Sequence, residues 1–182
     1  MKKHIPLYLY GLIIILVGIF LLVSENITFS LVKYSLGILL ILGSIFAFIT
    51  AFSRQRKQVQ FAYHEMHALA MLVYGIVVVL FCNSSERLEL VTAFLFIFYA
   101  FSEIIFCNWL FNLGQKVVFK IVAIRALLGL VIGIGTVVAI SYSEISLQVF
   151  GFLFIMVGIN IILYVPVMRS NLSTEINEEM KL

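Results

Sequence analysis

Charge is scarce in this chain. Only 12% of its residues are Asp, Glu, Lys or Arg, compared with about a quarter in soluble globular domains. Two prolines and two cysteines leave no proline-rich linker and no disulfide scaffold. The sequence also lacks a Gly-rich phosphate loop, a nucleophile elbow and a pair of carboxylates at catalytic spacing. The composition therefore excludes an ordinary soluble domain, and no motif supports an enzyme.

Long apolar runs are what the chain has in place of charge. Hydrophobic residues make up 63% of it, and the mean hydropathy is +1.16. A run of about 18 or more apolar residues can cross the hydrocarbon core of a bilayer as a helix. We count six such runs, of which the third is short and borders a polar segment: approximately Ile5–Val23, Leu31–Phe52, His67–Phe81, Leu90–Leu110, Ile121–Ile140 and Leu147–Met168.

The six runs predict an all-α integral membrane protein with one membrane domain over residues 1–182. The first run follows a positively charged start, but it is longer than the apolar part of a signal peptide and no small-residue cleavage site follows it. We therefore expect it to be retained as a transmembrane helix. The polar residues 169–182 are expected to form a frayed cytoplasmic tail that is too short for a further domain.

Lys and Arg residues predict the orientation. Ten lie on the side of the N-terminus, and only Lys33 and Arg87 lie on the opposite side; the ten are Lys2, Lys3, Arg54, Arg56, Lys57, Lys116, Lys120, Arg125, Arg169 and Lys181. Short loops rich in Lys and Arg stay in the cytoplasm. Both termini are thus expected to be cytoplasmic. The net charge of +3 follows from this topology and does not indicate a nucleic-acid partner.

Small residues recur at a regular interval along the chain. Gly18, Gly75 and Gly133 are spaced by 57 and 58 residues, and the same offsets align Gly43, Ala100 and Gly158 as well as Tyr10, His67 and Arg125. Such self-similarity is typical of internal repeats. It predicts three helical hairpins in the same orientation, over approximately residues 5–53, 66–111 and 121–168.

Glycine and alanine on helix faces predict close helix packing. Gly129 and Gly133 form a GxxxG pair, while Gly11 with Gly18 and Gly151 with Gly158 are each seven residues apart. In lipid, helices associate where small residues let their backbones approach. We expect these faces to pack the bundle itself, and contact between copies in a homo-oligomer is the alternative.

Two stretches resemble a known family. They are LYLYGLIIILVGIFLLVSENITFSLVKYSLGILLILGSIFAFITAF and RALLGLVIGIGTVVAISYSEISLQVFGFLFIMVGINIILY, and their pattern resembles the HdeD family of small bacterial membrane proteins. The resemblance implies six spans in three hairpin repeats, and a role in acid-stress tolerance without a catalytic motif or cofactor. The middle hairpin departs from the pattern because Ala100 stands where the other two have glycine.

Glu103 is the main candidate site residue, because it lies inside the fourth apolar run. A charge at the centre of a bilayer costs about 2.5 to 3.5 kcal/mol, so such residues face a bundle interior and find a partner. Arg125 enters the next run from the same side and at similar depth, so we expect the two to pair. His67 and Tyr10 occupy the position of Arg125 in the other repeats and would complete an intramembrane polar cluster. Two alternatives are that Arg125 extends to the headgroups and that a protonated Glu103 is hydrogen-bonded within the core.

Histidine and cysteine give weaker signals. His64 and His67 are three residues apart, which does not fit the zinc-protease spacing, so no metal is predicted. These two and His4 are expected on the cytoplasmic side, where a pH-sensing role is physically possible. Cys82 and Cys107 are expected at opposite membrane faces and therefore cannot bridge within one chain.

Three functions of different class remain open from sequence. The first is a non-enzymatic membrane protein of acid or envelope stress, as the resemblance implies. The second is a small transporter or channel subunit that uses the polar site at Glu103 and Arg125. The third, an intramembrane enzyme, lacks a reactive cluster. The only partner that the composition itself predicts is the lipid bilayer.

Overall fold

Regular structure in this chain is helical throughout the described residues. The computed structural model describes residues 5–52, 59–112, 119–142 and 147–179, with side chains in 5–49, 65–112, 119–142 and 147–166. The helices within these ranges are α1 (Ile5–Leu22), a short 3-10 turn η2 (Ser24–Asn26), α2 (Phe29–Phe52), α3 (Val59–Phe81), α4 (Ser85–Asn112), α5 (Phe119–Ser141) and α6 (Leu147–Glu179). The predicted all-α class is confirmed for this part of the chain.

Polar side chains and carbonyls before the helices help to set where they begin. Ser84 precedes α4, and its hydroxyl accepts a hydrogen bond from the backbone N–H of Arg87 at 3.3 Å. Thr28 precedes α2, and its carbonyl accepts bonds from the N–H groups of Leu31 and Val32. The first N–H groups of a helix have no partner inside it, so such caps stabilise the start.

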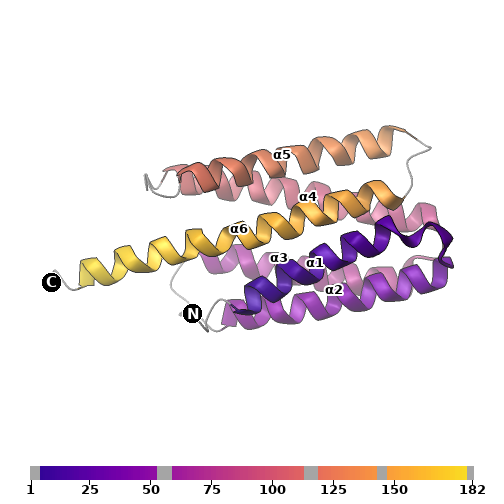
Figure 1. Cartoon of the computed structure of the whole chain (residues 1–182), viewed down its shortest axis with the longest axis horizontal. Coiled ribbons are helices and arrows are strands. Elements are labelled where there is room, and N and C mark those ends of the chain that lie inside the picture. The colour runs from indigo at the N-terminus through magenta and orange to yellow at the C-terminus, as the bar shows by residue number, and fades with distance from the viewer. Residues whose placement is uncertain (1–4, 53–58, 113–118, 143–146, 180–182) are drawn as a thin grey trace.

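The six helices form a closed ring. Each helix packs against its two neighbours in sequence, and α6 closes the ring by packing against α1. The helices run lengthwise side by side, and the start of α1 and the end of α6 point toward the same end of the bundle (Figure 1). The contacts α1–α6, α2–α3 and α4–α5 are more extensive than α1–α2, α3–α4 and α5–α6. Helices that belong to different predicted hairpins are thus the ones that pack most closely.

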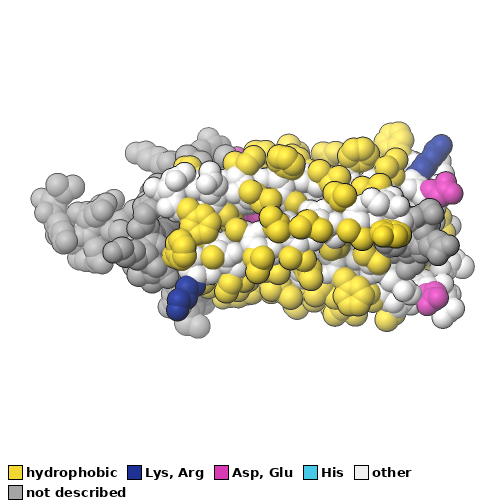
Figure 2. Space-filling model, turned by 90° about the horizontal axis from the view of Figure 1, so that it is seen from above, with side chains coloured by type: hydrophobic (Ala, Val, Ile, Leu, Met, Phe, Trp, Pro, Cys, Tyr) yellow, Lys and Arg dark blue, Asp and Glu magenta, His cyan; other side chains and the backbone are white. Residues whose placement is uncertain are grey.

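The outer surface of the ring suits lipid. Among the described residues, five helices are long and apolar enough to cross a membrane, through Ile5–Leu22, Phe29–Ile49, Ser85–Asn112, Phe119–Ser141 and Leu147–Pro166. In α3 the apolar part within the described side chains is shorter, Glu65–Phe81, so the sixth span stays a prediction. Hydrophobic side chains cover the middle of the face in Figure 2, and its visible Lys and Arg side chains lie toward the ends. This is the surface of a protein embedded in a membrane.

The last helix is longer than its apolar run. The run was expected to end at Met168, before a frayed tail, but α6 continues to Glu179. The expectation of a frayed tail was therefore wrong for these residues. Pro166 lies inside α6. A proline within a helix removes one backbone hydrogen bond, and the helix continues past it.

Glycine pairs bring the backbones of two helix pairs together. A Cβ atom placed on Gly18 of α1 would lie 2.5 Å from the carbonyl oxygen of Gly151 in α6, and one on Gly158 would lie 2.7 Å from that of Gly11. Gly75 of α3 meets the carbonyl of Gly37 in α2 in the same way, at 3.0 Å. No side chain fits at such contacts, which is why these positions need glycine. The predicted small-residue faces thus pack helices within one chain.

Candidate functional site

Glu103 and Arg125 form an ion pair inside the ring. Arg125 Nε donates to Glu103 Oε1 at 2.8 Å, and Nη2 donates to Oε2 at 2.9 Å. Nη2 also lies 2.6 Å from Oε1. The two side chains are 0% and 1% exposed. A two-point contact between guanidinium and carboxylate is among the strongest hydrogen-bonding arrangements in proteins, and here it joins α4 to α5.

Small and aromatic residues shape the space around the pair. Gly129 lies one turn after Arg125 on α5, and a Cβ atom there would approach Glu103 Cγ to 3.1 Å. The guanidinium Cζ lies 4.5 Å from the ring centroid of Tyr164 and 5.6 Å from that of Phe106. A cation over an aromatic face is stabilised by the ring's negative charge density. Glycine therefore makes room for the carboxylate, and two aromatic rings cover the cation.

A stripe of polar groups runs along α4 on either side of the carboxylate. Tyr99, Glu103 and Cys107 follow one another at intervals of four, so they share one helix face. The Cys107 thiol donates to Glu103 Oε1 at 3.3 Å. Tyr99 accepts a hydrogen bond at its hydroxyl from Asn160 Nδ2 of α6, at 2.9 Å. The stripe thereby connects α4 with α6 as well as with α5.

His67 contacts the same face of α4 from α3. Its Nε2 lies 3.2 Å from the hydroxyl of Ser102, and its ring meets that of Tyr99 edge to face at 4.9 Å. Ser102 already donates its single hydroxyl proton to the Tyr99 carbonyl, at 2.9 Å. The direction of the hydrogen bond between Ser102 and His67 depends on the imidazole tautomer. His67 is 5% exposed, so it is a buried residue that helps to join α3 to α4.

Tyr10 is buried on α1 and lies close enough to Tyr99 to interact with it electrostatically, but it is not hydrogen-bonded to the network. Its ring packs over Gly43 of α2, where an added Cβ atom would meet it at 3.5 Å. Its hydroxyl has no hydrogen-bond partner among the described residues. The structure thus brings Glu103 and Arg125 together and places His67 beside them through Ser102 and Tyr99. It provides no hydrogen bond from Tyr10 to the other three.

The arrangement is suited to holding helices together. Both charges are neutralised by each other, and their exposed fractions of 0% and 1% leave no surface for a water-borne substrate. Within the described residues, no group of three or more His, Cys, Asp or Glu side chains could hold a metal ion. The side chain of His64 and the whole of His4 lie outside the described residues, so the predicted histidine sensor is untested there.

Several members of the site were not identified from sequence. Tyr99 and Cys107 lie four residues on either side of Glu103, and that spacing alone would have placed them on its face. Asn160 and Tyr164 carried no such signal. They come from α6 and reach the site only because the ring closes.

The two cysteines lie toward opposite ends of the α3–α4 hairpin. Both are free and buried. Cys82 lies directly after α3, and Cys107 lies near the far end of α4.

Comparison with known proteins identified one family. Residues 9–81, which run from α1 to the end of α3, match a family described as a short repeat of unknown function, DUF308. This match agrees with a multi-pass helical membrane protein that contains an internal repeat. Comparison with curated proteins and with solved structures found no match. The chain is thus similar, over its first three helices, to a family of short repeats.

Proposed function

We propose that this chain is a non-enzymatic multi-pass protein of the bacterial cytoplasmic membrane that supports tolerance of acid or envelope stress, as in the HdeD family. Two findings support the proposal. The match to a short repeat family covers α1 to α3, and five helices are long and apolar enough to span a bilayer. Both termini would lie in the cytoplasm, on the side with ten of the twelve Lys and Arg residues.

The order of helix contacts supports the three-hairpin repeat within this proposal. The ring alternates three less extensive contacts inside the hairpins with three more extensive contacts between them. Three equal copies around an axis along the membrane normal would produce such alternation. Direct contacts between glycine backbones occur at two of the more extensive interfaces, α1–α6 and α2–α3. The third, α4–α5, contains the ion pair of Glu103 and Arg125.

The sealed ion pair is the observation that carries the non-enzymatic proposal. A buried charge that loses its partner costs about 3–5 kcal/mol, so the pair fixes α4 against α5. The carboxylate oxygens, Nε and Nη2 are hydrogen-bonded to each other, Oε1 also accepts from Cys107, and the guanidinium lies over the ring of Tyr164. A polar site of this kind stabilises a fold and presents no reactive group to a substrate.

A small transporter is less well supported. It would need a route for water or substrate to Glu103, and this side chain is 0% exposed. The groove between α3 and α4 is lined by other residues and is apolar. Pathways for ions and polar solutes are lined by polar groups, so the groove does not resemble such a pathway.

The test is survival of a deletion strain after acid challenge. The strain would be complemented with wild type, with Glu103→Gln, or with Lys120→Gln as a control at an exposed cation outside the site. We expect deletion to lower survival and wild type to restore it. Glu103→Gln should rescue in proportion to the folded protein in the membrane, because its role is structural.

Two outcomes would contradict the proposal. An unchanged survival of the deletion strain removes the stress role. A Glu103→Gln protein that reaches wild-type amounts in the membrane but gives no rescue assigns the carboxylate a direct role, and the transporter then becomes the better hypothesis.

Reporter fusions at Leu182 and in the loop after Phe81 would test the orientation, since only the first should report a cytoplasmic location.

A further inference from the structure

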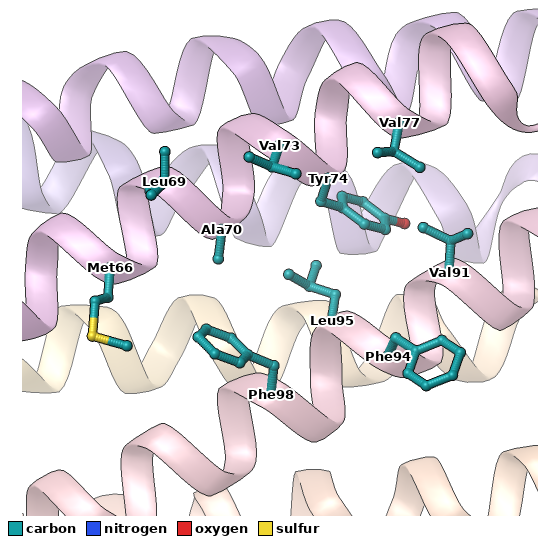
Figure 3. Close-up of a pocket in the computed structure, with 10 residues that line it drawn as sticks. All are labelled: Met66, Leu69, Ala70, Val73, Tyr74, Val77, Val91, Phe94, Leu95 and Phe98. Atoms are coloured by element: carbon teal, nitrogen blue, oxygen red, sulfur yellow. The ribbon is translucent and has the colours of Figure 1, made fainter.

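The contact between α3 and α4 is the least extensive in the ring. A groove of about 430 Å³ lies between these two helices and opens to the side. Figure 3 shows side chains of both helices turned toward this space, Met66 and Ala70 from one and Leu95 and Phe98 from the other. The ring is therefore incompletely filled between α3 and α4, on its membrane-facing surface.

The lining of the groove is almost purely apolar. Its one hydroxyl belongs to Tyr74, which is bonded to Thr92 of α4 at 2.5 Å and so is already satisfied. Side chains along the rim are half or more exposed, such as Leu69 at 54% and Phe94 at 65%. Such a surface takes up a hydrocarbon chain and offers nothing to a polar solute.

Two cations lie where α3 ends. Arg87 is exposed, and it precedes Val91 and Phe94 of the groove by four and seven residues, so it lies on their face of α4. Lys33 of α2 is 8% exposed and forms no ion pair with any described residue. Both are close enough to Cys82, the first residue after α3, to affect its thiol: burial raises the pKa of Cys82, and the two cations oppose that rise.

The length of α4 between Arg87 and Phe98 matches the thickness of one membrane leaflet. Arg87 precedes Phe98 by eleven residues, which is about 16 Å of helix at 1.5 Å per residue. Half of a bilayer's hydrocarbon core is about 15 Å thick. A lipid whose phosphate lies at the level of Arg87 would therefore place its acyl chain along the α4 side of the groove, from Val91 to Phe98.

We propose that this face binds one glycerophospholipid, with its phosphate at Lys33 and Arg87 and one acyl chain in the groove between α3 and α4. Phosphate supplies a counter-charge to Lys33, whose side chain forms no ion pair with any described residue and whose Nζ lies 5.4 Å from the ring centroid of Tyr34. The acyl chain covers exposed apolar surface at the weakest contact of the ring. Glu86 lies next to Arg87 in the first turn of α4 and supplies negative charge for the ammonium of phosphatidylethanolamine, so this lipid is the probe.

The experiment is native mass spectrometry of the full chain in mild detergent, titrated with dioleoyl phosphatidylethanolamine. Wild type should retain one lipid per chain in a saturable manner. Lys33→Gln with Arg87→Gln should lower retention at least fivefold by removing the phosphate contacts. Ala70→Phe should do the same by filling the groove. Arg87→Gln alone, at an exposed position, provides a variant whose folding is not at risk.

Matched controls lie on α5. Lys120→Gln removes an exposed cation, and Leu130→Phe enlarges a side chain on the membrane-facing surface. Both should retain lipid as wild type does, and circular dichroism should show that all variants are folded. Equal retention in every variant, or none in wild type, would overturn the proposal. So would a dimer that Ala70→Phe abolishes, because the groove would then hold a second copy.

Discussion

The α1–α6 and α4–α5 interfaces solve the same packing problem in different ways. Gly18 and Gly151 bring the backbones of α1 and α6 into direct contact. Between α4 and α5, Gly129 instead makes space for the Glu103 side chain, and Arg125 holds that side chain with two hydrogen bonds. One interface depends on close approach of backbones and the other on a buried pair of charges.

The difference lies in what each interface tolerates. A backbone carbonyl cannot move away from an added methyl group without moving its whole helix. The side chain of Glu103 can rotate, but it cannot lose its partner without leaving a charge in a dry, apolar interior. Steric change should therefore damage α1–α6 most, whereas a change of charge should damage α4–α5 most.

Removing one charge should have the largest effect. Arg125→Gln leaves the Glu103 carboxylate buried without its counter-charge, and we expect a loss of about 3–5 kcal/mol in the free energy of unfolding. The measurement is unfolding by denaturing detergent in micelles, with Lys120→Gln as the control. The exchange Glu103→Arg with Arg125→Glu should restore part of the loss. Strictly additive losses in the double-mutant cycle would show that the two side chains are not coupled.

Adding a methyl group at the backbone contact between α1 and α6 should cause the second-largest loss of stability. In Gly18→Ala the new methyl would lie 2.5 Å from the Gly151 carbonyl oxygen. Overpacking of this kind costs about 1–3 kcal/mol, more than the gain of about 1 kcal/mol from replacing a helical glycine by alanine. The matched control is Gly133→Ala, which meets only the Ala100 methyl at 3.2 Å. If Gly133→Ala destabilised the protein as much as Gly18→Ala, the contrast between the interfaces would be lost.

Gly129→Ala should combine a steric effect with an effect on the ion pair of Glu103 and Arg125. Its methyl would approach Glu103 Cγ to 3.1 Å, and the flexible side chain can yield by a few tenths of an ångström. We expect a loss below about 1 kcal/mol, together with a smaller coupling energy between Glu103 and Arg125 in the double-mutant cycle. An unchanged coupling energy would mean that Gly129 does not position the carboxylate.

Tyr99→Phe should have the smallest effect. It removes the hydroxyl that accepts the hydrogen bond from Asn160 and leaves both interfaces in place. Hydrogen bonds between helices in membranes average about 0.6 kcal/mol, and a loss of that size is expected in the same unfolding assay. A loss as large as that of Arg125→Gln would show that the hydroxyl supports the ion pair itself.

Much of the fold was predictable because the membrane limits the choices. Backbone N–H and C=O groups must be satisfied within each segment in lipid, so a long apolar run is a helix. The limits of α1 and α5 agree with their runs to within two residues. Misjudged limits occur where the sequence is polar, as at the end of α6, because hydropathy does not report helix formation outside the membrane.

Part of the candidate site could be predicted from the sequence, and Asn160 shows why the rest could not. Glu103 stood out because a carboxylate in an apolar run needs a partner, and Arg125 was near it in the chain and at the same depth. Asn160 is 61 residues from Tyr99, to which it bonds. Nothing local connects them, so only the closure of the ring by α6 could identify the contact.

The sequence by itself determined that this protein is helical and membrane-embedded. It also led to the expectation that Glu103 and Arg125 pair. Those features follow from hydration, since apolar runs and isolated charges have few stable arrangements in a bilayer. Which faces meet was decided by the tertiary structure alone. Gly18 contacts Gly151, and α3 and α4 leave a groove, because both features depend on how six helices fill one ring.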